Sequence, residues 1–475
     1  YKPKSHIPVS LKGVEEGDFT FVFGYPGQTQ EYLPSFAIEM ITGHENPVAI
    51  RLREKRLGIF DNYMNQSSLV RIQYSAKHAG VANYWKKMIG ENRGINKLDA
   101  IEKKQAFENE FQKWAQSNPM LNSKYGQLIS SFKKTYSELQ PLNVAETYLI
   151  EGGLGVELIT FARRFNKLVE MSKDKTVTAE AMEEAITQLK NGISGYFKNY
   201  HQPLDKKVFS TLMADWFANQ PDVNIPMELR TERAKYSSFD DWAAALYQKS
   251  AFADSLKVRK LLDGIKGKNC KRIAKDPAYI LSSAIYNYYI TQILPDAGKL
   301  TSRLDSLQRI YMTAQMEFQP EKRFYPDANS TLRVTYGRVD DYIPRDAVKY
   351  NYYTTLEGIM EKEDPTVYDY VVESKLKKLY EARDYGPYSA TDGTMRVAFT
   401  ASNHTTGGNS GSPVLNADGH LIGVNFDRNW EGTMSDLMYD PDQCRNISLD
   451  IRYCLFIIDK FAGAGHLVNE MTIIR

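Results

Sequence analysis

A short glycine-rich loop in the last quarter of the chain contains residue types that can carry out nucleophilic chemistry. It reads Thr-Thr-Gly-Gly-Asn-Ser-Gly-Ser-Pro-Val over residues 405–414. The hydroxyl group of Ser410 can attack an acyl carbon once a neighbouring base accepts its proton. Glycine permits the tight backbone that points the N–H groups of Gly408 and Ser410 at one developing oxyanion. The pattern therefore predicts a serine nucleophile with an oxyanion hole beside it.

A hairpin loop made only of small turn-forming residues is the simplest alternative interpretation of this segment. It explains the glycines, but it does not explain why Pro413 and a β-strand follow the loop at once. The core Gly-x-Ser-Gly-x-Pro around Ser410 resembles the nucleophile loop of chymotrypsin-like serine peptidases. In that fold the triad follows the chain order histidine, aspartate, serine, and the first two residues lie on the first of two β-barrels. Ser410 would then belong to the second barrel.

The histidine and aspartate that such a serine needs cannot be identified in this chain. His404 lies just before Ser410 in the same segment, and surface or packing roles suit all seven histidines better. The chain begins at Tyr1, with neither an initiator methionine nor a signal peptide. We therefore expect both catalytic partners to lie upstream of Tyr1 and these 475 residues alone to be inactive. The other histidines are His6, His44, His78, His201, His420 and His466.

Two β-rich regions enclose a long region with a helical pattern. Residues 7–41 read as strands, with a tight turn at Gly24-Tyr-Pro-Gly27. Apolar residues then recur at the helical period, and Ser238-Phe-Asp-Asp241 has the form of a capping box. Strict alternation of apolar and polar residues resumes at Thr331. A β-domain is therefore split by a helical insert.

The expected fold class is α+β and multidomain, since the length suits about three domains. We interpret the 24–27 turn as a segment late in a first barrel. The chain would then be a chymotrypsin-like double β-barrel, with its first barrel largely missing and with a large all-α insert domain. The expected parts are the end of the first β-barrel in residues 1–44, an α-helical cap domain in residues 45–326, and the second β-barrel in residues 327–475.

Composition argues against several other classes of protein. The chain has 60 Lys+Arg and 58 Asp+Glu, and no basic run is interleaved with aromatic residues, so we expect no nucleic-acid partner. No stretch approaches the ~20 apolar residues that a membrane span needs. Cys270, Cys444 and Cys454 lack the spacing of metal ligands, although the last two could pair in an oxidising compartment. We expect neither a metal nor a cofactor.

Several segments outside the motif resemble one peptidase family. Together with the helical insert, they are similar to the bacterial serine dipeptidyl-peptidases 7 and 11. The resemblance implies that the helical domain closes the cleft beyond the substrate's N-terminus, which makes the enzyme an exopeptidase. It also implies oligopeptide substrates, a homodimer, and a place in the periplasm or on the cell surface of a Gram-negative bacterium. The segments are residues 83–86, 325–329, 405–415 and 423–427.

Arg428 indicates which residue would precede the cleaved bond. The family members that take Asp or Glu at P1 have arginine just after the position of Asp427, whereas those that take bulky apolar residues have glycine. A guanidinium is always charged and binds a carboxylate through two parallel hydrogen bonds. The resemblance is therefore closest to the Asp/Glu-specific dipeptidyl-peptidase 11. A surface ion pair of Arg428 with Asp427, Glu431 or Asp436 is the alternative.

Asp427 and Asn83 match the family positions that hold the free α-amino group of the substrate. A carboxylate and a side-chain carbonyl both suit an ammonium donor. If this anchor lies about two extended residues, roughly 7 Å, from Ser410, then the distance between anchor and nucleophile fits a dipeptide, and cleavage releases one. For Asn83, an ordinary amide on a helix surface is the alternative.

These observations favour the release of N-terminal dipeptides with Asp or Glu at P1, through an acyl-enzyme at Ser410. A glutamyl endopeptidase of the same fold would keep Arg428 but leave the cleft open to a continuing chain. A helical peptide-binding module with a barrel that does no chemistry is the alternative from another class of function.

Overall fold

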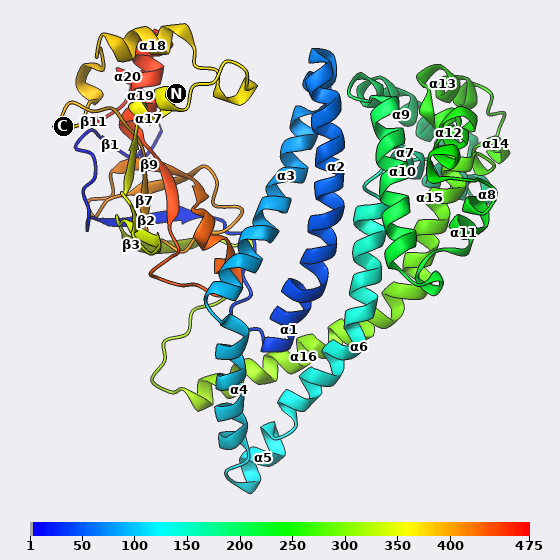
Figure 1. Cartoon of the computed structure of the whole chain (residues 1–475), viewed down its shortest axis with the longest axis horizontal. Coiled ribbons are helices and arrows are strands. Elements are labelled where there is room, and N and C mark those ends of the chain that lie inside the picture. Colours follow the sequence, from blue (N-terminus) through cyan, green and yellow to red (C-terminus); the bar gives the residue numbers. More distant parts are fainter. Residues whose placement is uncertain (1–2) are drawn as a thin grey trace. The chain divides into compact units, whose positions relative to one another are not determined.

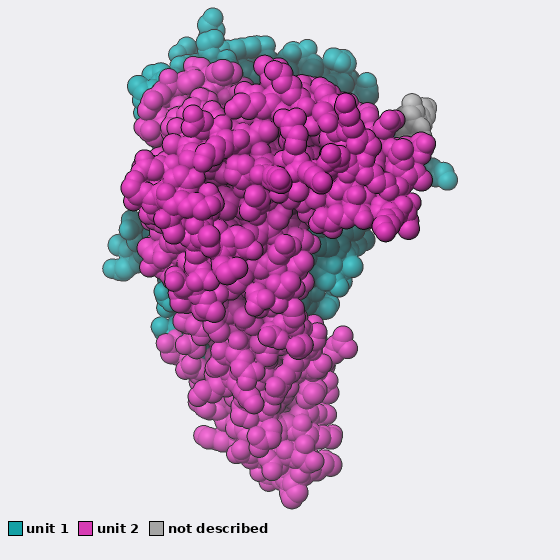
Figure 2. All heavy atoms as spheres, turned by 90° about the vertical axis from the view of Figure 1, so that its right-hand side faces the viewer, with its two compact units in different colours: residues 1–33, 90–101, 321–475 teal, residues 34–89, 102–320 magenta. Residues whose placement is uncertain are grey.

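The computed structural model describes residues 3–475, which form two compact units (Figures 1 and 2). Unit 1 contains the described residues up to Leu33, together with residues 90–101 and 321–475. Unit 2 contains residues 34–89 and 102–320. Every strand found in the described part of the chain belongs to unit 1, whereas unit 2 is helical. The fold is therefore of the mixed helical and sheet class.

Unit 1 is built around one nine-stranded sheet whose main path runs β3-β2-β8-β9-β10-β7-β6, with all neighbours on this path antiparallel. The short strand β1 pairs in parallel with β11 and with β9, and β4 and β5 form a separate pair. The strands are β1 (Val9–Ser10), β2 (Phe19–Gly24), β3 (Arg333–Arg338), β4 (Tyr342–Arg345), β5 (Val348–Tyr350), β6 (Tyr353–Thr355), β7 (Arg396–Ala401), β8 (Ser412–Leu415), β9 (Leu421–Arg428), β10 (Asn446–Asp450) and β11 (Ile473–Ile474).

Alternating apolar side chains give this sheet a buried face. Val22 of β2, Phe399 of β7, Val414 of β8 and Ile422 of β9 lie in one buried cluster. A strand projects successive side chains to opposite faces, so this alternation is what a half-buried strand requires. The short helices of unit 1 are α17 (Leu356–Glu361), η6 (Tyr368–Tyr370), α18 (Ser374–Glu381), η7 (Gly386–Tyr388), η8 (Trp430–Asp436), α19 (Ile451–Phe456), η9 (Ile457–Phe461) and α20 (Gly465–Val468).

Strand β2 lies in residues 1–44, the segment that we predict to end a first barrel. It lies between β3 and β8, in the same sheet as the strands that flank Ser410. Val22 is fully buried and pairs with Val414, so β2 contributes to the apolar core of this sheet. In the sequence, the helical insert thus separates two strands that are neighbours in one sheet. Strand β2 ends at Gly24, and β3 begins at Arg333.

Unit 2 consists of helices, some of which are extended by short π-helical or 3₁₀ segments. The last part of α3, from residue 90, and the start of α4, up to residue 101, belong to unit 1. The elements are α1 (Ser35–Met40), η1 (Ile41–Glu45), α2 (Asn46–Gln66), α3 (Ser68–Lys97), α4 (Ala100–Ala115), α5 (Pro119–Tyr125), α6 (Leu128–Tyr148), η2 (Leu149–Gly153), α7 (Glu157–Arg163), α8 (Asn166–Lys173), α9 (Ala179–Lys198), α10 (Gln202–Asn219), η3 (Asp222–Asn224), α11 (Met227–Arg233), α12 (Phe239–Lys249), η4 (Ala251–Ala253), α13 (Ser255–Asp263), α14 (Lys271–Ala274), α15 (Pro277–Tyr288), η5 (Tyr289–Ile293) and α16 (Leu294–Phe318).

Buried carboxylates and capping side chains satisfy the free backbone groups at several helix starts in unit 2. Ser238 caps α12, since its hydroxyl oxygen accepts the N–H of Asp241 at 3.0 Å, as the capping-box pattern predicted. Asp205 accepts the N–H groups of Glu157 and Leu158 at the start of α7, at 2.8 and 2.9 Å. Over residues 3–475, no helix combines the length and the apolar character needed to cross a bilayer.

Candidate active site

Ser410 lies in the loop between β7 and β8, with an exposed side chain. Its hydroxyl group donates a hydrogen bond of 3.3 Å to the carbonyl oxygen of Phe426 on β9. Gly408 and Gly411, on either side of Ser410, have φ values of 106° and 82°, in the region that favours glycine. The backbone around the serine therefore has the conformation for which the glycines were expected.

The turn at residues 24–27 packs directly against the Ser410 loop. The N–H group of Gly27 donates to the carbonyl oxygen of Gly407 at 2.6 Å. A Cβ atom on Gly408 would lie 2.4 Å from the carbonyl oxygen of Tyr25. The N–H groups of Gly408 and Ser410 make no hydrogen bond with any other residue in the described part of the chain. Both N–H groups are therefore available to an oxyanion.

Three buried asparagines attach the Ser410 loop to the sheet. Asn409 accepts the N–H of Thr406 on its side-chain oxygen at 3.1 Å, and its carbonyl oxygen accepts the side-chain amide of Asn425 at 3.2 Å. The side-chain amide of Asn446 donates in turn to the side-chain oxygen of Asn425 at 3.0 Å. Sequence reasoning missed this set. The available signal was polar amides within strands that otherwise place apolar residues in the core.

Arg428, at the end of β9, forms a bidentate ion pair. Its Nη1 and Nη2 atoms donate to Oδ1 and Oδ2 of Asp436 at 2.7 and 2.9 Å, and Nη1 also donates to the Ser435 hydroxyl oxygen at 2.8 Å. Burial opposes its charge, yet the pair with Asp436 holds the pKa of Arg428 above its ordinary value. Asp436 is thus the partner among the three acidic residues that the sequence had left open.

The ion pair with Asp436 leaves one edge of the guanidinium group of Arg428 unused. A guanidinium has five N–H groups in one plane: an end-on pair on Nη1 and Nη2, a side-on pair on Nε and Nη2, and an outer N–H on Nη1. Asp436 binds the end-on pair and Ser435 the outer N–H. The side-on pair makes no hydrogen bond within residues 3–475. Arg428 can therefore bind a second carboxylate through two parallel hydrogen bonds.

Two pockets meet at Arg428. The smaller has a volume of about 10 Å³, the space of roughly one water molecule, and lies beside His404, Ser435 and Tyr439. The larger has a volume of about 380 Å³, within the usual range for ligand pockets, and was not expected from the sequence. Its aromatic lining consists of Tyr342, Tyr350, Tyr352, Tyr353, Phe399 and Trp430.

The two residues expected to bind the substrate's α-amino group lie in different units. Asp427 precedes Arg428 on β9, in unit 1, and its exposed carboxylate accepts the N–H group of Arg428 at 2.8 Å. Asn83 lies on α3, in unit 2, and its side chain is exposed. The structure thus groups Ser410, Gly408, Asp427 and Arg428 in unit 1.

No histidine is hydrogen-bonded to Ser410 among residues 3–475. His404 instead donates from Nε2 to the carbonyl oxygen of Ser435 at 3.0 Å, and its ring stacks on Tyr439 with centroids 4.6 Å apart. Burial lowers the pKa of His404. The residue therefore helps to hold the pocket beside Arg428, and the general base stays unassigned within the described residues.

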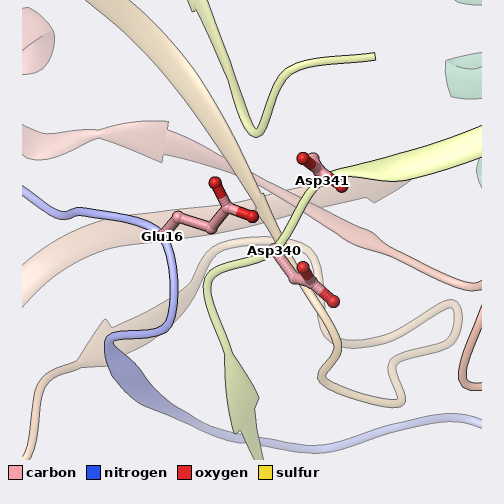
Figure 3. A group of neighbouring side chains, drawn as sticks. All are labelled: Glu16, Asp340 and Asp341. Atoms are coloured by element: carbon pink, nitrogen blue, oxygen red, sulfur yellow. The ribbon is translucent and has the colours of Figure 1, made fainter. Parts of the chain in front are cut away.

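Three acidic side chains, Glu16, Asp340 and Asp341, come close enough together to hold a cation (Figure 3). Asp340 forms an ion pair with Arg445 at 2.7 Å, and Asp341 forms one with Lys349. Two of the three carboxylates therefore already have cationic partners from the protein.

The three cysteines are free thiols, including Cys444 and Cys454, whose pairing the sequence had left open.

The chain is similar to known peptidases along its whole length. The family model of peptidase S46 matches residues 1–473. The Asp/Glu-specific dipeptidyl-peptidase of Flavobacterium psychrophilum is 44% identical over 476 residues, and the dipeptidyl-peptidase 7 of Phocaeicola vulgatus is 36% identical over 479 residues. Both alignments cover 100% of this chain, which spans 66% of the first relative and 65% of the second.

Solved structures are similar as well. The crystal structure of Porphyromonas endodontalis DPP11 in complex with the dipeptide Arg-Glu matches with a TM-score of 0.88 and 33% sequence identity. That match covers 100% of this chain and 67% of the other. The crystal structure of the same protein in complex with substrate gives a TM-score of 0.86.

Proposed function

This chain belongs to the peptidase S46 family, and we propose that the complete protein is a serine exopeptidase that releases N-terminal dipeptides with Asp or Glu at P1 from oligopeptides. The observation that carries the proposal is the side-on N–H pair of Arg428, which has no acceptor within residues 3–475. Arg428 lies at the end of β9, and the Ser410 hydroxyl donates a hydrogen bond to Phe426 of the same strand. Relatives named Asp/Glu-specific dipeptidyl-peptidases support the same substrate class.

In the proposed reaction, the Ser410 oxygen attacks the carbonyl carbon of the second residue and gives its proton to a general base. The N–H groups of Gly408 and Ser410 stabilise the oxyanion of the tetrahedral intermediate. Collapse of this intermediate breaks the C–N bond, the leaving amine takes the proton, and an ester to Ser410 remains. Water then hydrolyses the ester by the same steps. We propose that the base and its aspartate lie outside residues 1–475, so that these residues alone are inactive.

The P1 carboxylate would bind the side-on edge of Arg428, while the end-on edge stays with Asp436. The α-amino group would bind Asp427 and Asn83. Recognition of a free α-amino group would make the enzyme an exopeptidase, because a continuing chain has no ammonium group at that position. Carboxylate and amide oxygens are suitable acceptors for an ammonium group. Asp427 follows Phe426, whose carbonyl oxygen accepts the Ser410 hydroxyl at 3.3 Å, and this adjacency supports an anchor about one dipeptide from the nucleophile.

We also propose a barrel architecture, an oligomeric state and a cellular location for the complete protein. The sheet of unit 1 would be the second barrel of a chymotrypsin-like double β-barrel, and the first barrel would lie mostly outside this chain. The family resemblance supports a homodimer in the periplasm or on the cell surface of a Gram-negative bacterium. Light scattering on the complete protein tests the dimer, and fractionation of the source cells tests the location.

Hydrolysis of fluorogenic dipeptide substrates by the complete protein tests the activity. Cleavage after Glu and Asp should exceed cleavage after Leu, and a fluorophosphonate probe should label the protein but not a Ser410→Ala variant. Blocking the substrate's α-amino group should abolish cleavage. Undiminished cleavage of the blocked substrate would favour a glutamyl endopeptidase, and an unlabelled Ser410 would favour a non-catalytic peptide-binding module.

A further inference from the structure

We infer that Asp436 is a positioning residue for acidic specificity, because it holds Arg428 with the side-on N–H pair turned towards the P1 carboxylate. This inference deepens the proposed function and rests on it. Asp436 would act through Arg428 and not on the reacting atoms.

The geometry of the ion pair leaves Arg428 little rotational freedom. The guanidinium group is planar and rigid, so three hydrogen bonds on the end-on edge and the outer N–H also fix the direction of the other two N–H groups. These three bonds measure 2.7, 2.8 and 2.9 Å, and the side chains of Arg428 and Asp436 are only 14% and 15% exposed. Solvent therefore has limited access to the bonds between the two side chains.

Asp436 is itself held by its backbone neighbours in unit 1. Its carbonyl oxygen accepts the N–H group of Gln30 at 2.7 Å. The preceding residue, Ser435, is 2% exposed, and its carbonyl oxygen accepts Nε2–H of His404. The two acceptors of Arg428 therefore sit on a segment that is fixed from both sides, which suits a residue that sets the orientation of another.

Close packing holds the rest of η8 in place as well. A Cβ atom on Gly90 would lie 2.2 Å from the Thr433 hydroxyl oxygen, and one on Gly94 would lie 2.7 Å from Cγ of Met434. The end of α3 that belongs to unit 1 thus lies directly against the segment before Asp436. Because closely packed interiors resist displacement, this packing holds the segment that carries Asp436 in its position beside Arg428.

A competing role for Asp436 makes the opposite prediction. If Asp436 occupied the donors that the substrate needs, or if its negative charge mainly repelled the P1 carboxylate, then removing it would improve cleavage after Glu. The observed bonds leave the side-on pair unoccupied, so the positioning role predicts that removing Asp436 weakens cleavage after Glu. The sign of the effect separates the two roles.

The test is the selectivity of the complete protein for P1 Glu over P1 Gln, which has the same shape without the charge. Asp436→Asn should lower kcat/KM for the Glu substrate by about tenfold or more and change the Gln substrate by less than about twofold. Asp436→Glu, which restores a carboxylate, should recover part of the ratio. The control Asp442→Asn removes the same charge at an exposed side chain that makes no bond to Arg428, and it should leave the ratio unchanged.

The outcomes separate the inference from the proposed function. If the unsubstituted protein does not prefer Glu to Gln, the proposed function fails. If it does, and Arg428→Gly removes the preference, then an unchanged or raised ratio in Asp436→Asn overturns the inference alone. An equal loss on both substrates would indicate a purely structural role and would also overturn it. If Asp436→Asn does not fold, Ser435→Ala decides, because loss of the Nη1 acceptor should lower the same ratio.

Discussion

Gly408 and Tyr25 approach so closely that no side chain fits between them, because a Cβ atom on Gly408 would lie 2.4 Å from the Tyr25 carbonyl oxygen. These two residues come from the two ends of the chain. The turn that contains Tyr25 therefore supports the loop from which Ser410 and the proposed oxyanion donors project. The conformation of Gly408 adds a second constraint, since its φ of 106° is strained for any other residue.

Replacing Gly408 by alanine should disable the oxyanion hole. The new methyl group displaces the loop from Tyr25, so kcat of the complete protein should fall by about 100-fold or more. Gly407→Ala is the matched control, because a Cβ atom on Gly407 meets no atom within 4 Å. Steady-state kinetics on both variants, with circular dichroism to monitor folding, make the comparison. Similar activity of the two variants would show that the approach to Tyr25 does not matter.

Replacing Arg428 by glycine should remove the preference for acidic P1 residues. The P1 carboxylate would then enter a pocket without its two parallel donors, and kcat/KM for Glu and Asp substrates should fall by about 100-fold. Asp436 would also lose its partner and repel the substrate. Arg428→Lys should keep part of the activity, since it retains a charge but not the planar donor pair. Unchanged kcat/KM for the acidic substrates in Arg428→Gly would remove Arg428 from the pocket.

Local patterns predicted individual elements of this fold, but they did not predict partners that are distant in sequence. Alternation from Thr331 predicted a strand that the structure places at Arg333–Arg338, and the capping box at Ser238 marked the start of α12. The pairing of β3 with β2 was missed. It depends on the shared core formed once the helical insert has folded, and no local propensity encodes that.

The site shows the same division between motif and orientation. The types and spacing of Gly408 and Ser410 identified them as candidates, and the family resemblance identified Arg428. The bond between Arg428 and Asp436, and the asparagines behind Ser410, depend on which face of the sheet each residue occupies. A register irregularity between β9 and β10 at Ile447 and Ser448 changes that face, and a strict period of two cannot anticipate it.

Replacing Asp205 by asparagine should destabilise unit 2. The carboxylate is almost fully buried and also accepts the hydroxyl groups of Tyr247 and Tyr200 at 2.7 and 3.2 Å, in addition to the two N–H groups of α7. An asparagine amide cannot accept on its nitrogen, so the free energy of unfolding should fall by about 3 kcal/mol. Thermal unfolding measures the change, with the exposed Asp240→Asn as control. Equal melting temperatures of the two variants would contradict this role.

Replacing Glu108 by glutamine should make stability less dependent on pH. Glu108 is 3% exposed and accepts the N–H and hydroxyl groups of Ser35 at 2.6 and 2.7 Å at the start of α1. Burial raises the pKa of Glu108, whereas an unfolded chain has about 4.3. The unfolded state therefore gives up this proton first as pH rises, so the contribution of Glu108 is fully present below about pH 4.3 and is lost as pH passes the folded-state value. Glutamine does not titrate. The melting temperature of Glu108→Gln relative to the unsubstituted protein should rise between about pH 4 and 7, while a constant difference would mean that Glu108 titrates alike in both states.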